Sequence, residues 1–144
     1  MIEAARVAEV LGGTKVLKRR VRTLSDLEQS VADGLPKGTL RKSLAYILTD
    51  SAEITKFTYK IVPEGTYKRR RTTFTPDESE RVERLARLIA MAEYVWDDRD
   101  AARRFLTSPH PAFDGRAPID LARSELGARR VEALLEDILH GLPV

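Results

Sequence analysis

Apolar residues recur every three or four positions along most of the chain, which is the pattern of helices that bury one face. The clearest helix begins at Thr75, where Pro76 and Glu78 follow in the order that caps a helix start. Its apolar face is predicted to contain Val82, Leu85, Leu88, Ile89, Ala92 and Trp96. We expect this helix to join the two halves of the molecule through a shared core.

Shorter helices are predicted on both sides of this long one. Ser25 and Glu28 have the spacing of a capping box, so a helix is expected from Asp26 to near Gly34. The other predicted helices are residues 3–11, stopped by Gly12 and Gly13; one opened by Pro36; one capped by Asp98; one opened by Pro118 and closed by Gly127; and a last one carrying Val131, Leu134, Leu135, Ile138 and Leu139. Lys15 to Thr23 is expected to be a basic connector, and Ser108 to Ala117 a proline-rich loop.

Residues 54–62 are ambiguous, because Phe57, Tyr59 and Ile61 alternate as they would in a strand. A lone strand would leave its backbone groups unpaired, and no second strand pattern exists in the chain. We therefore predict a helix here and an all-α fold. It consists of an N-terminal helical bundle over residues 1–74 and a small helical C-terminal domain over residues 75–144.

Charge divides the chain into two unequal parts, although the net charge of the 144 residues is only +3. Residues 1–76 contain 15 Lys and Arg against 8 Asp and Glu, whereas residues 77–144 contain 10 against 14. A basic front half is suited to a polyanion such as nucleic acid. Ordinary solvated surfaces would explain the same charges, so composition alone leaves both interpretations open.

Composition also limits the compartment and the chemistry. Apolar residues make up 42% of the chain and charged residues 33%, as in globular proteins. No stretch has the length of a membrane span, and the start has no signal-peptide pattern. The chain has no cysteine, which excludes disulfides and thiol chemistry. We expect a cytoplasmic protein with no cofactor and no metal.

The segment from Ala52 to Arg71 fits a helix-turn-helix, with Pro63 at the start of its second helix. Such a motif places the start of its second helix in the major groove, while basic groups hold phosphates. Gly65 inside that helix costs roughly 1 kcal/mol relative to alanine. The predicted DNA-binding residues are Lys60, Glu64, Thr66, Tyr67, Lys68, Arg69, Arg70 and Arg71.

The last third of the chain has an unusual order of prolines, glycines and short helices. Its distinctive positions are Phe105, Leu106, Pro109 to Phe113, Gly115 to Pro118, Leu121, Glu125 to Ala128, Arg130, Val131, Leu134, Leu135 and Gly141. At these positions the chain resembles the toxin-binding domain of the Xre/MbcA/ParS antitoxins. The front half resembles the Xre-type DNA-binding domain of the same family, through fewer residues.

The resemblance implies an antitoxin that neutralises an NAD-degrading RES-domain toxin and represses its own operon at operator DNA. In the family, the C-terminal end of the antitoxin blocks the entrance to the toxin's active site. The positions expected to bind toxin are Arg130, Leu134, Asp137, Ile138, His140, Gly141, Leu142, Pro143 and Val144. A homodimer is expected, because helix-turn-helix proteins commonly match two-fold operators.

The residues also suggest two other functions. One is a stand-alone transcriptional regulator whose C-terminal domain only dimerises. The other is a hydrolase using Ser108, His110 and Asp114, but these lie along one loop broken by prolines rather than converging from separate elements. A role in turn formation explains them better, and no enzyme activity is expected.

Overall fold

The computed structural model describes residues 2–142, and within this range the regular elements are all helices, with no strand. In chain order they are α1 (Ala4–Val10), α2 (Gly13–Leu17), α3 (Leu24–Asp33), α4 (Gly38–Ala45), α5 (Ser51–Ile61), α6 (Glu64–Arg69), α7 (Pro76–Trp96), α8 (Arg99–Thr107), the 3-10 helices η1 (Pro111–Phe113) and η2 (Pro118–Arg123), and α9 (Glu125–Leu139). The all-α prediction is confirmed, including the helix over residues 54–62.

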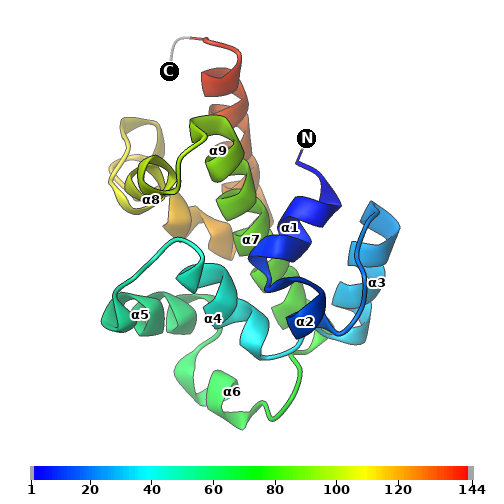
Figure 1. Cartoon of the computed structure of the whole chain (residues 1–144). Coiled ribbons are helices and arrows are strands. Elements are labelled where there is room, and N and C mark those ends of the chain that lie inside the picture. The colour runs from blue at the N-terminus through cyan, green and yellow to red at the C-terminus, as the bar shows by residue number, and fades with distance from the viewer. Residues whose placement is uncertain (1, 143–144) are drawn as a thin grey trace.

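Helix α7 runs through the middle of the molecule, with the earlier and later helices packed around it (Figure 1). Its start has the predicted capping box: the Glu78 backbone N–H donates to the Thr75 hydroxyl at 3.2 Å, and the Glu78 carboxylate accepts from the Thr75 N–H at 2.9 Å. The predicted face is buried except for Trp96, which is 39% exposed at the last turn and packs against the Phe105 ring.

A single hydrophobic core spans both halves of the sequence. Leu11 and Leu44 from the front half and Leu135 from the back half are each fully buried with the apolar face of α7. The backbone N–H of Leu35 donates to the buried Ser79 hydroxyl of α7 at 2.8 Å, which ties the front half directly to this helix. The predicted shared core is therefore confirmed.

Two helix starts differ from the prediction. Thr23, rather than Ser25, caps α3: its hydroxyl accepts from the Asp26 N–H at 3.1 Å, and the Asp26 carboxylate accepts from the Thr23 N–H at 3.1 Å. The helix then begins at Leu24 and buries Leu27 in the core. The expected connector contains the short helix α2, and α4 begins at Gly38, two residues after Pro36.

Gly127 does not close a helix as predicted, but lies in the first turn of α9. The preceding 3-10 helix η2 ends at Arg123, and the next residue, Ser124, caps α9 because its hydroxyl accepts from the Gly127 N–H at 3.0 Å. A Cβ at Gly127 would overlap the backbone carbonyl oxygen of Leu121. Glycine is therefore required by the close approach of η2 to α9 rather than by a helix end.

Candidate functional site: a helix-turn-helix and a helical C-terminal end

Helices α5 and α6 form the predicted helix-turn-helix. The Asp50 carboxylate caps α5 by accepting from the Ala52 N–H at 3.3 Å. A residue before proline avoids the helical conformation, so Pro63 holds Val62 extended and ends α5 at Ile61. Pro63 is the N-cap of α6, which begins at Glu64, and the buried Val62 anchors the turn in the core.

Most of the predicted DNA-binding residues lie on the outer surface of α6 and just after it. Thr66 is partly exposed and accepts a hydrogen bond from the Arg69 guanidinium at 3.2 Å. Glu64 and Lys68 form an exposed ion pair one helical turn apart, at 2.6 Å. Arg71 follows the helix and is exposed. These five side chains are accessible to a large ligand.

Three other predicted DNA-binding residues, Tyr67, Lys60 and Arg70, make contacts within the protein instead of standing free on its surface. The Tyr67 ring is partly buried between Tyr59 and Phe74, at centroid distances of 5.9 and 6.2 Å, with Lys37 over its face. The Lys60 ammonium pairs with Asp120 of η2 at 3.0 Å.

Arg70 is the third of these residues. Its Nε and Nη2 atoms donate to the two carboxylate oxygens of Glu78 at 2.7 and 2.6 Å. Glu78 is 4% exposed, and the Arg70 guanidinium together with the Thr75 backbone N–H lowers the pKa of its carboxyl from 4.5 to about 2. Arg70 thereby closes the segment after α6 onto the first turn of α7.

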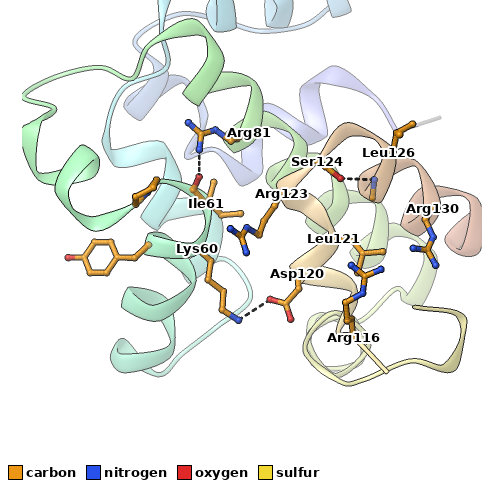
Figure 2. A pocket seen from close by; sticks show the side chains of 13 residues that line it. Lys60, Ile61, Arg81, Arg116, Asp120, Leu121, Arg123, Ser124, Leu126 and Arg130 are labelled. Carbon is orange, nitrogen blue, oxygen red and sulfur yellow. Dashed lines mark hydrogen bonds and ion pairs between the residues drawn. The ribbon is translucent and has the colours of Figure 1, made fainter. Parts of the chain in front are cut away.

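A basic groove of about 610 Å³ lies beside the helix-turn-helix, between α5 and the start of the C-terminal helices. From α5 and α7 come Lys60 and Arg81, and from the later segments come Arg116, Arg123 and Arg130. Figure 2 shows the Arg123 side chain reaching from η2 toward α5. Nothing in the sequence pattern indicated this groove, because its walls are about sixty residues apart, as the pair of Lys60 with Asp120 shows.

The chain that follows α9 forms a defined turn up to Leu142 and is not a frayed helix end. The N–H of Gly141 donates to the Ile138 carbonyl at 3.0 Å, and the N–H of Leu142 donates to the Asp137 carbonyl at 2.8 Å. Gly141 has φ of +68°, so these bonds form a Schellman motif with glycine at its left-handed position. The motif fixes the direction in which the chain leaves the helix.

The predicted toxin-binding residues are distributed unevenly around this end. His140, Gly141 and Leu142 are exposed, and Asp137 and Ile138 are partly exposed. The prediction that Leu134 binds toxin is corrected by its burial. It is only 6% exposed and packs in the core, because it lies on the same helix face as Val131 and Leu135. Pro143 and Val144 lie outside the described residues.

Arg130 lies near the other end of α9. Its Nη2 atom donates to the Ala112 carbonyl at 3.0 Å and its guanidinium lies 5.4 Å from the centre of the Phe113 ring. It therefore holds the loop around η1 and lines the basic groove. The same loop uses His110 as a capping residue, since its Nδ1 accepts from the Ala112 N–H at 3.0 Å.

The helix-turn-helix and the C-terminal end lie at opposite ends of the molecule (Figure 1). The far end combines the last turns of α7 and α9, and it carries large apolar side chains in contact with solvent. Tyr94 is 50% exposed, Leu139 43% and Leu142 53%. Within residues 2–142 no cluster of potential metal ligands is present, and no helix there is long and apolar enough to cross a membrane.

Comparison with known proteins agrees with this arrangement. The profile described as the antitoxin Xre-like helix-turn-helix domain matches residues 26–87, and that of the antitoxin Xre/MbcA/ParS C-terminal toxin-binding domain matches residues 91–141. The two matches meet within α7 and so cover both ends of the molecule.

Two curated relatives carry the same name. The chain is 30% identical to the Antitoxin Xre of Pseudomonas putida, over 96% of this chain and 94% of that one. It is 34% identical to the Antitoxin Xre of Yersinia enterocolitica over 56% of this chain and 57% of that one. Neither relative is named as an enzyme. The full-length match, with both domains in order, shows that this chain belongs to the Xre antitoxin family.

Proposed function

We propose that this antitoxin neutralises a cognate NAD-degrading RES-domain toxin with the C-terminal end of α9, and represses its own operon by placing α6 in operator DNA. The observation that carries the proposal is the separation of the two sites. The helix-turn-helix and the exposed end of α9 lie at opposite ends of one hydrophobic core, so one molecule can hold DNA and toxin together.

The end of α9 is suited to entering a protein pocket. The Schellman motif at Gly141 orients the residues that follow, so they are already ordered before binding up to Leu142. Ordering a segment in advance reduces the entropy lost on association. Leu142 presents an exposed apolar side chain, and Asp137 adds a carboxylate close by. An anionic, apolar tip complements a pocket that receives an anionic dinucleotide.

DNA binding is assigned to the accessible residues of the second helix. The N-terminal residues of a recognition helix contact base edges, so Glu64 and Thr66 are placed nearest the bases. Lys68, Arg69 and Arg71 are placed on phosphates. We propose that two copies bind together, because helix-turn-helix operators are commonly two-fold symmetric.

Copurification tests the neutralisation half of this proposal. A tagged copy of the chain is expressed with the untagged protein encoded by the neighbouring reading frame, and the captured complex is identified by mass spectrometry. We expect a stoichiometric complex with a RES-type protein, and loss of that complex when residues 141–144 are deleted. If the complex survives the deletion unchanged, residues 141–144 are not part of the interface with the toxin.

A further inference from the structure

The basic groove beside α5 gathers positive charge from the acidic half of the sequence. Five cationic side chains line it, at positions 60, 81, 116, 123 and 130, against a single carboxylate, Asp120. That carboxylate is already paired with Lys60 at 3.0 Å. The charge division seen along the sequence is therefore not a division in space, because the two halves place cations around the same groove.

The cationic side chains that line the groove differ in the hydrogen bonds that they make within the protein. Arg81 donates to the Ile61 carbonyl at 2.9 Å, and Arg116 to the Phe113 carbonyl at 3.3 Å. Arg123 is exposed, and among the described residues its guanidinium has no hydrogen bond or ion pair. A carbonyl neutralises no charge, so the groove keeps a net positive charge with Arg123 free to bind an external anion (Figure 2).

The position of the groove relates it to the helix-turn-helix. Its lining includes Tyr59 and Lys60 near the end of α5, and Pro63 at the N-cap of α6. In a helix-turn-helix complex the second helix enters the major groove and the first crosses the phosphate backbone. A phosphate strand that passes over α5 beside α6 would therefore meet Arg123 and Arg116.

We propose that the groove binds the phosphate backbone of the same duplex that α6 enters, so that the toxin-binding domain contributes directly to DNA affinity through Arg123 and Arg116. The inference rests on the proposed operator binding. An acidic segment of the toxin would have similar chemistry, but the groove lies at the start of α9, whereas the proposed toxin contact lies at its other end.

The test measures binding to a duplex from the region upstream of the chain's own gene, at several salt concentrations, using the full-length protein. The variant is Arg116→Ala with Arg123→Ala. The matched control is Arg104→Ala with Arg129→Ala, which removes the same charge from two exposed arginines outside the groove. Arg123→Ala alone is included, because Arg116 also holds the η1 loop. Thermal unfolding checks that each variant is folded.

Each phosphate contact contributes about 0.9 to the slope of log affinity against log salt, so we expect the double variant to lose about 2 from the slope and about tenfold in affinity. Arg123→Ala alone should lose about 1 from the slope. The control should bind as the wild type does.

If both groove variants bind DNA as the control does, the inference is overturned while operator binding stands. That result together with a weakened toxin complex would assign the groove to the toxin. If the wild type does not bind the duplex at all, the proposed repression falls with the inference.

Discussion

The Arg70 guanidinium holds both carboxylate oxygens of Glu78, at 2.7 and 2.6 Å, across the turn between α6 and α7. Glu78 is almost fully buried, and it also accepts from the Thr75 backbone N–H at the start of α7. Arg70 lies within a run of basic residues that looks like a DNA contact, yet its structural role is to close the helix-turn-helix onto the central helix.

Substituting Arg70 separates these two roles. Arg70→Ala leaves the buried Glu78 carboxylate without its cation, so we expect a loss of about 2–3 kcal/mol in the free energy of unfolding. The matched variant Arg71→Ala removes an exposed side chain and should change it by less than about 0.5 kcal/mol. Urea denaturation measures both. Equal stability of the two variants would contradict the assigned role of Arg70.

The low pKa of Glu78 predicts a pH dependence of stability. Its carboxyl has a pKa of about 2 in the folded protein, against an ordinary 4.5, so the folded state favours the ionised form. The resulting stabilisation is fully present above pH 4.5 and is lost as the pH falls toward 2. A shift of this size corresponds to about 3 kcal/mol.

The comparison of wild type with Glu78→Gln isolates this contribution from those of other carboxyls. Denaturation of both proteins at a series of pH values should show a stability difference that is constant above pH 4.5 and shrinks toward pH 2. A difference that stays constant down to pH 2 would show that Glu78 keeps its ordinary pKa.

Two glycines in helices predict opposite effects of alanine. At Gly127 a Cβ would overlap the Leu121 carbonyl oxygen, so Gly127→Ala should cost about 1–3 kcal/mol. At Gly65 the nearest atom to a Cβ is the Arg69 Nη1 at 3.6 Å, so Gly65→Ala should stabilise α6 by about 0.5–1 kcal/mol. Thermal unfolding ranks the two variants, and the reverse order would contradict the packing of η2 against α9.

The accessible cations of the helix-turn-helix predict an effect on DNA affinity. Arg69→Ala with Arg71→Ala should weaken binding to the upstream duplex by about tenfold, because each removed phosphate contact lowers the salt slope by about 0.9. Their exposure predicts little change in melting temperature. A mobility shift at moderate salt, with Lys15→Ala and Lys18→Ala as a charge-matched control, measures it. Affinity equal to the control would exclude α6 as the recognition helix.

The sequence predicted the helices but not all of their limits, and the reason is visible at α3. Thr23 with Asp26 and Ser25 with Glu28 both have capping-box spacing, so local pattern alone cannot choose between them. In the structure Thr23 and Asp26 form the capping box, and the helix begins at Leu24. The central helix was predicted with its cap, since Thr75 and Glu78 have no such competitor.

The candidate sites were predicted as regions rather than as individual side chains. The lack of a partner strand predicted α5, Pro63 predicted the start of α6, and helical periodicity predicted α9. None of these local signals could show that Lys60 pairs with Asp120, sixty positions away. The same limit applies to the groove around Arg123, which exists only where the two halves meet. Leu134 was expected both in the core and at the toxin, and burial assigns it to the core.

Two variants test the residues after α9, from Gly141 to the end of the chain: one removes them, and the other changes only their conformation. Deletion of Gly141 to Val144 should weaken neutralisation without lowering the melting temperature, because Gly141 and Leu142 are exposed. Gly141→Ala keeps the length of the tail but disfavours the left-handed conformation at φ of +68°, so it should weaken neutralisation less. Growth of cells that co-express the toxin compares them. Full protection by the deletion variant would exclude the tail as the blocking element.

Cellular NAD tests the central claim most directly. The protein encoded beside this chain is induced alone, with the full-length chain, or with the chain lacking residues 141–144, and NAD is measured over time. The proposal predicts that NAD falls when the neighbour is expressed alone, stays near the uninduced level with the full-length chain, and falls again with the shortened chain. An equal fall of NAD with and without the full-length chain would contradict neutralisation.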